Sequence, residues 1–109
     1  MSIEIIKAFS GQKPIVIYPV YLDITGDYAT AAALGRVLYW HEVMQGKFDK
    51  TDSDFAMDLC VTSRQFKRIK ATLKTLSFLK ITVEQMPSKT FYEVNEGELI
   101  VLINSMSGV

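Results

Sequence analysis

Hydrophobic positions recur with a helical period through the middle of the chain. After Thr25-Gly26-Asp27, which is typical of a helix start, "YATAAALGRVLYWHEVMQG" continues to Gly46, a residue type that commonly follows a helix end. So wide an apolar surface predicts a central, mostly buried helix. Its apolar positions fall into two adjacent stripes, which are Ala33, Val37, Trp40 and Met44 in the first and Leu34, Leu38 and His41 in the second.

The segments before this helix are apolar and β-branched, which favours extended structure. "IEIIKAF" predicts a short N-terminal strand. The run from Ile15 to Tyr18 predicts a second extended segment, which Pro19 ends because proline cannot donate to a sheet ladder.

Two shorter helices are predicted after the central one. Thr51 with Asp54 three residues later fits a capping-box pattern, and Thr62 with Gln65 fits the preferred form of the same pattern. Only two residues, enough for a turn, separate the helices, and the second is expected to run to about Leu76. The apolar face of the first is formed by Phe55, Ala56 and Leu59.

The C-terminal third predicts a β-hairpin and a final helix. "FLKITVEQ" alternates apolar and polar residues, "MPSK" is a turn, and "TFYEVN" is a returning strand. The tail "EGELIVLINSM" fits a short helix or a strand, and we favour the helix. The whole therefore predicts one α+β domain over residues 1–109 with a winged helix-turn-helix architecture, in which the helix-turn-helix spans about 51–76 and the wing about 78–95.

The net charge of the chain is zero, but the charges are unevenly distributed along the sequence. The chain carries 12 Lys+Arg and 12 Asp+Glu, but residues 61–90 have seven cations and one acid. On a helical projection, Phe66, Ile69, Leu73 and Leu76 form the core stripe of the helix 62–76, and most of its cations lie opposite. A solvated helix face usually mixes signs, because like charges four residues apart repel. A stripe of one sign instead favours nucleic-acid binding.

In that interpretation the N-terminus of the helix 62–76 enters the major groove of duplex DNA. Arginine can read guanine with two hydrogen bonds, whereas lysine more often holds phosphate. Ala71 would allow close approach, although helix propensity explains it equally well, and Gln65 more plausibly caps the helix than reads a base. The candidate DNA-binding residues are Ser63, Arg64, Lys67, Arg68, Ala71 and Lys74 on the helix, and Ser88 and Lys89 at the hairpin tip.

Three segments, "AAALGRVLYWHE", "KTDSDFAMDLCVTSRQFKRIKATLKTLSFLKI" and "PSKTFYEVN", resemble the winged helix-turn-helix domains of phage and plasmid replication proteins and related small regulators of mobile elements. The resemblance covers about residues 18–96. It implies that Thr62 caps the recognition helix, that Ser63, Arg64, Lys67 and Arg68 face DNA, and that Lys89 lies in the wing. Cys60 stands where the family's turn often has glycine. Since replication proteins of this kind usually carry a further domain, an end at residue 109 favours a stand-alone regulator or accessory factor.

Little in the sequence indicates catalysis, so we expect no enzyme, no cofactor and no metal. His41 is the only histidine and Cys60 the only cysteine, and Asp52 and Asp54 are better explained by the start of a helix than by a metal site. No apolar run is long enough to span a membrane, and the single cysteine fits a cytoplasmic protein.

Two functions remain in competition. The first is a double-stranded DNA binder, acting as a homodimer or as an accessory factor in replication. The second is a protein-interaction module on the same scaffold, which the zero net charge keeps open. The apolar ends "IEIIKAF" and "LIVLI" either form a dimer surface or close the core.

Overall fold

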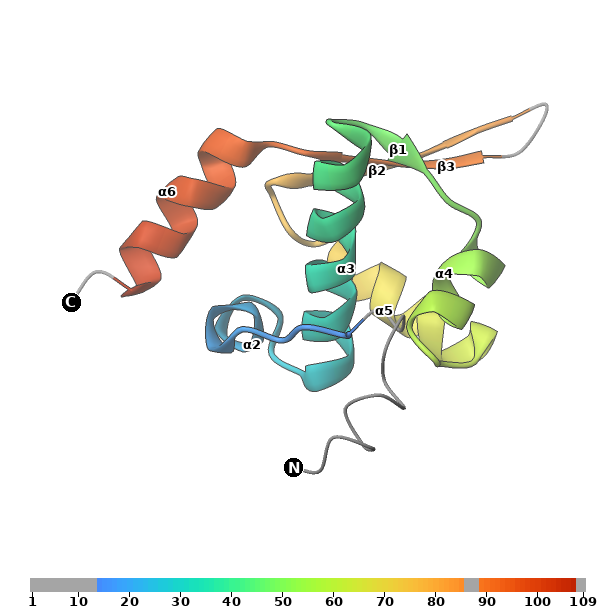
Figure 1. Ribbon diagram of the computed structural model, residues 1–109, viewed down its shortest axis with the longest axis horizontal. Coiled ribbons are helices and arrows are strands. Elements are labelled where there is room, and N and C mark those ends of the chain that lie inside the picture. The colour runs from blue at the N-terminus through green and yellow to red at the C-terminus, as the bar shows by residue number, and fades with distance from the viewer. Residues whose placement is uncertain (1–13, 86–88, 108–109) are drawn as a thin grey trace, which may run out of the picture.

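The computed structural model describes residues 14–85 and 89–107, which form five helices and a small three-stranded antiparallel sheet (Figure 1). The fold is therefore α+β, and the strand order in the sheet is β1-β3-β2. The segment "IEIIKAF" lies outside the described residues. In chain order the elements are α2 (Pro19–Thr25), α3 (Tyr28–Met44), β1 (Phe48–Asp49), α4 (Asp52–Asp58), α5 (Ser63–Leu73), β2 (Leu79–Glu84), β3 (Lys89–Val94) and α6 (Glu96–Ser107).

The predicted central helix is confirmed as α3, which stands in the middle of the molecule in Figure 1. It begins after Asp27, whose carboxylate accepts a hydrogen bond from the backbone N–H of Thr30 at 2.8 Å. It ends where Gln45 takes a left-handed conformation with φ of 54°. The innermost residues of both stripes are fully buried, but Met44 is exposed because the last turn of α3 extends beyond the core.

The run Ile15–Tyr18 does not form a strand as its sequence suggested, because no strand of the described sheet includes these residues. Pro19 does not end an element but starts α2, since a proline at the first helical position gives up an N–H that would have no partner. The segment before α2 instead crosses α3 closely. A Cβ atom at Gly35 would lie 2.6 Å from the carbonyl oxygen of Val16, so only glycine allows this approach.

The predicted hairpin is confirmed as β2 and β3, with Leu79 opposite Val94 and Glu84 opposite Lys89. The alternation is correct near the core, where Leu79 is buried, but fades toward the tip, where Val83 is 46% exposed. One boundary is wrong: Lys89 belongs to β3 rather than to the turn. The two-residue strand β1, which pairs with β3, was too short for its sequence to indicate.

One hydrophobic core joins α3, the sheet and the two short helices. At its centre Phe55 contacts both Phe66 and Tyr92, with ring centroids 5.1 and 5.3 Å apart. Phe48 from β1 also stacks on Tyr92, with ring centroids 5.2 Å apart. These aromatic contacts fix α4 and α5 against the sheet.

The hydroxyl of Tyr92 is buried and has no hydrogen-bond partner within the described residues. Burial, and secondarily the negative charge of Asp52, raises the pKa of Tyr92. The unfolded chain therefore ionises this group near its ordinary value of 10 while the folded chain keeps it neutral, so stability falls as the pH rises above about 10, by up to about 1.4 kcal/mol per pH unit.

We expect Tyr92→Phe to raise the free energy of unfolding by about 1 kcal/mol at neutral pH, because it removes an unsatisfied buried hydroxyl. The gain should grow further above pH 10. Urea denaturation of both proteins at pH 7 and pH 11 measures it. If the gain shrank at high pH instead, the raised pKa of Tyr92 in the folded chain would be contradicted.

The tail forms a helix, as favoured from the sequence: α6 begins after Asn95, whose side-chain oxygen accepts from the backbone N–H of Glu98 at 3.0 Å. It extends outward from the end of β3, on the side of α2 (Figure 1). Among the described residues, no helix has the length and apolar character needed to cross a membrane.

Candidate nucleic-acid interface

The turn between α4 and α5 is fixed at both ends. Val61 donates its backbone N–H to the carbonyl of Ala56 at 3.0 Å, and Cys60 takes a left-handed conformation with φ of 59°. The side chain of Thr62 accepts from the N–H of Gln65 at 3.1 Å, and the side-chain oxygen of Gln65 accepts in turn from the N–H of Thr62 at 2.8 Å. The predicted capping box is confirmed, and Gln65 has the structural role expected of it.

The left-handed Cys60 explains why glycine would suit this turn, because a Cβ atom costs about 1–2 kcal/mol there. The greater freedom that glycine gives to the unfolded chain offsets part of that gain. We therefore expect Cys60→Gly to raise the free energy of unfolding by about 0.5–1 kcal/mol. Cys60→Ala is the matched control, since it removes the thiol and keeps the Cβ atom, and it should change stability little. Equal effects of the two changes in thermal denaturation would contradict this explanation.

Helix α5 separates its apolar and cationic residues onto opposite faces. Phe66, Ile69 and Leu73 are buried, as predicted, and Leu76 is half-buried just beyond the helix end at Leu73, which comes earlier than the expected limit. The opposite face is exposed over its whole length. It contains Ser63, Arg64, Lys67, Arg68, Ala71 and Lys74, and we call these six residues the α5 outer face.

The four cations of the α5 outer face form no ion pair within the described residues, whereas the fifth cation of the helix does. Lys70 points toward α4, where its Nζ atom lies 2.9 Å from Oδ1 of Asp52 and its side chain is only 12% exposed. Lys70 is therefore not part of the α5 outer face.

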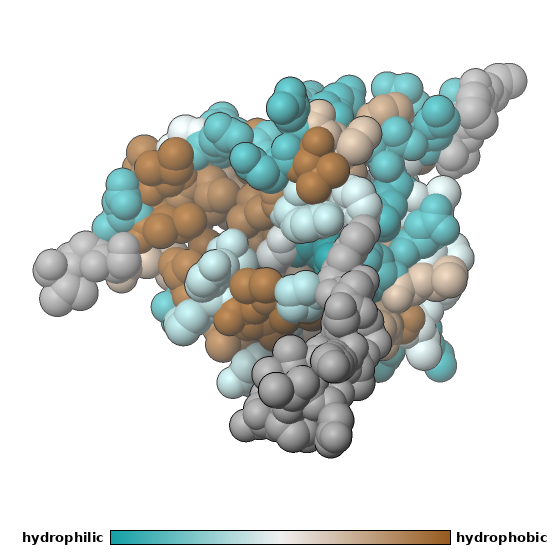
Figure 2. Space-filling model, in the orientation of Figure 1, coloured by the Kyte–Doolittle hydropathy of each residue, from teal (hydrophilic) through white to brown (hydrophobic). Residues whose placement is uncertain are grey.

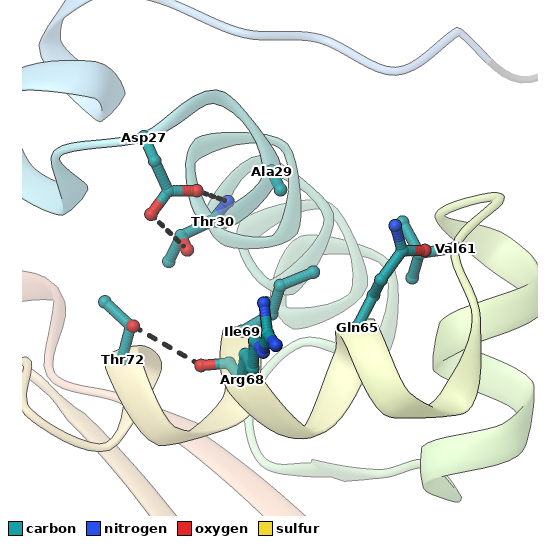
Figure 3. A pocket seen from close by; sticks show the side chains of 8 residues that line it. All are labelled: Asp27, Ala29, Thr30, Val61, Gln65, Arg68, Ile69 and Thr72. Carbon is teal, nitrogen blue, oxygen red and sulfur yellow. Dashed lines mark hydrogen bonds between the residues drawn. The ribbon is translucent and has the colours of Figure 1, made fainter.

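One edge of the α5 outer face borders a groove of about 280 Å³ between α5 and the start of α3. Figure 3 shows Gln65, Arg68 and Thr72 along α5, with Asp27 and Thr30 across the groove. The carboxylate of Asp27 is already occupied by the N–H and hydroxyl of Thr30, both at 2.8 Å. Arg68 is thus exposed beside an acid that is committed to capping α3.

The hairpin contributes less positive charge than the sequence suggested. Ser88 lies outside the described residues, and Lys89 faces Glu84 across the two strands. Lys80 likewise faces Glu93. Because directly opposite residues in an antiparallel pair are close neighbours, each of these lysines has an acid beside it.

The remaining polar candidates have structural partners. His41 is largely buried, and its Nε2 atom lies 2.6 Å from Oε1 of Glu96, which links the end of α3 to the start of α6. Within residues 14–85 and 89–107, no three His, Cys, Asp or Glu side chains gather closely enough to hold a metal ion. Asp52 and Asp54 lie in the first turn of α4, as expected from helix capping.

The sequence did not reveal a polar cluster around Asp58. One of its oxygens accepts from the indole N–H of Trp40 at 2.9 Å and lies 3.4 Å from Nε of Arg36. Nζ of Lys50 lies 3.8 Å from the same oxygen and 4.3 Å from the centre of the Trp40 ring. Arg36 is 5% exposed. This cluster connects α3, the segment after β1, and α4, and so helps to hold α4 against α3.

Comparisons with protein-family models, with curated proteins and with solved structures find no match to this chain.

Proposed function

We propose that this chain is a double-stranded DNA-binding protein of the winged helix-turn-helix class, with α5 as the recognition helix and β2–β3 as the wing. The order of elements supports the architecture, because a helix, a short strand, two helices across a tight turn and a hairpin follow one another, and the short strand pairs with the second hairpin strand. The resemblance to phage and plasmid replication domains points to a small regulator or replication accessory factor acting in the cytoplasm.

The observation that carries the proposal is the α5 outer face, with four exposed cations that no acid in the described residues neutralises. An external polyanion would relieve their mutual repulsion. The capping box fixes the start of α5, so Ser63 and Arg64 are presented first to the major groove. Arg64 and Arg68 are the side chains best suited to read guanine, and Lys67 and Lys74 to hold phosphates.

The charge of the hairpin limits the role of the wing. With Lys80 and Lys89 each opposite a glutamate, the wing adds little to the attraction of phosphates. DNA affinity should therefore depend on α5 almost alone.

The test is a titration of a labelled random duplex of about 20 base pairs at salt concentrations from about 50 to 200 mM. If the four α5 cations each contact one phosphate, the log–log slope of affinity against salt should be about −3.6 per protomer. The single strand of the same sequence serves as the comparison, and it should bind more weakly. No binding to the duplex at the lowest salt would refute the proposal and favour the interaction-module alternative.

A further inference from the structure

Helix α6 has two apolar faces, although a helix on the surface of a protein needs only one. The inner face is formed by Leu99, Leu102 and Ile103, which are buried or half-buried against the body of the protein. The outer face consists of Gly97, Ile100, Val101 and Asn104, at the spacing i, i+3, i+4, i+7, and all four are exposed. Ile100 is 56% and Val101 69% exposed. In Figure 2 hydrophobic surface gathers over α6 and α2.

Gly97 suggests that another backbone approaches this outer face. Among the described residues, a Cβ atom at this position would meet nothing closer than the side-chain oxygen of Asn95 at 3.6 Å, which is ordinary contact. The described part of the chain therefore does not require glycine here, and glycine is a poor helix former. A close neighbour outside the protomer would account for it, because glycine allows two backbones to come near each other.

We propose that the outer face of α6 is a two-fold interface, which pairs α6 antiparallel with the same helix of a second copy of this chain. A two-fold axis between Ile100 and Val101 places Ile100 opposite the partner's Val101, and Gly97 opposite the partner's Asn104. The large side chains then meet at the centre, and the glycine leaves room for the amide. The stripe is thus complementary to itself, as an interface between identical surfaces requires.

The charges of α6 favour the antiparallel arrangement. Its acids, Glu96 and Glu98, are both at its start, and the helix contains no cation. Antiparallel pairing sets each acidic start beside the uncharged end of the other helix, and separates the two pairs of acids by roughly 10 Å along the helix axes, which exceeds the Debye length of about 8 Å at physiological salt. Parallel pairing would bring four carboxylates together. The same acids disfavour DNA or an acidic protein as the occupant.

Next to Ile100 lies a hollow of about 280 Å³ between α6 and α3, lined by the apolar Leu38 and Leu99 and by the polar His41, Glu42 and Glu96. Two helices of this length bury less than a standard interface, so we expect weak association, with a dissociation constant on the order of 1–100 µM. The inference does not rest on DNA binding, but it would present two α5 helices together to a two-fold site.

Sedimentation of the full chain from about 1 µM to several hundred micromolar tests the dimer. The wild-type chain should pass from monomer to dimer, and Val101→Glu should weaken association at least about 30-fold by placing two charges near the axis. Met57→Glu is the matched control, since Met57 is 74% exposed on α4, and it should leave association unchanged. A wild-type chain that stays monomeric, or a dimer insensitive to Val101→Glu, would overturn the inference.

Cross-linking tests the geometry in a Cys60→Ala background, which removes the exposed native cysteine. A mixture of Gly97→Cys and Asn104→Cys chains should form a disulfide between copies on mild oxidation, because antiparallel pairing brings these positions together. Gly97→Cys alone should not form one. The reverse result would show parallel pairing and reject the proposed arrangement.

Discussion

Asp58→Ala is expected to lower the free energy of unfolding by about 3–5 kcal/mol, because it would leave the buried guanidinium of Arg36 without its carboxylate. The same change removes the acceptor of the Trp40 indole N–H, and with it the anion that lies closest to Lys50. A domain of this size has a total stability of about 5–15 kcal/mol, so this loss is a large fraction of the total and would nearly unfold a chain at the lower end of that range.

Urea denaturation followed by circular dichroism measures this loss. Asp54→Ala is the matched control, since Asp54 is an exposed acid of the same helix, and it should cost less than about 1 kcal/mol. Adding Arg36→Met to Asp58→Ala should restore part of the lost stability, because it removes the unpaired buried charge. Similar losses for Asp58→Ala and Asp54→Ala would show that the cluster contributes little.

The second large effect concerns DNA affinity. Combining Arg64→Ala, Lys67→Ala and Arg68→Ala should weaken duplex binding by at least about 100-fold near 100 mM salt, because each side chain that binds DNA is worth about 1–3 kcal/mol. The salt slope should flatten by about 0.9 for each phosphate that the variant no longer binds. All three side chains are exposed, so the melting temperature should change by only a few degrees.

Lys80→Ala is the control for this experiment, because it removes a cation that faces Glu93 on the hairpin. Its effect on affinity should be less than about threefold. If Lys80→Ala weakened binding as much as the triple variant, the interaction would be a general response to positive charge. The α5 outer face would then not be the binding surface.

Features that depend on neighbours in sequence could be predicted from the sequence. Thr62 and Gln65 form their capping box because the two residues are one helical turn apart, whatever else the chain does. Phe66, Ile69 and Leu73 face inward because their spacing matches the helical period. The same helical period predicts that Arg64, Lys67 and Arg68 face outward.

Features that depend on distant pairing could not be predicted. The two residues of β1 are a strand only because Tyr92 and Phe91, more than forty positions later, supply the partner strand. Asp58 meets Trp40 only after α3 and α4 have packed together. The prediction that Pro19 ends an extended segment is wrong, since Pro19 begins α2. A proline can do either, and the local sequence fits both.

The sequence by itself thus determined that α5 is a capped, amphipathic helix with a positive outer face, since these properties are local and periodic. Only the tertiary structure decided which cations on that helix and on the hairpin remain without an acid. Asp52 takes Lys70 because α4 packs beside α5, and β-pairing sets Glu84 beside Lys89 and Glu93 beside Lys80. Whether an acid neutralises a cation depends on the distance between the two groups. For residues far apart in sequence, that distance is fixed only when the chain has folded.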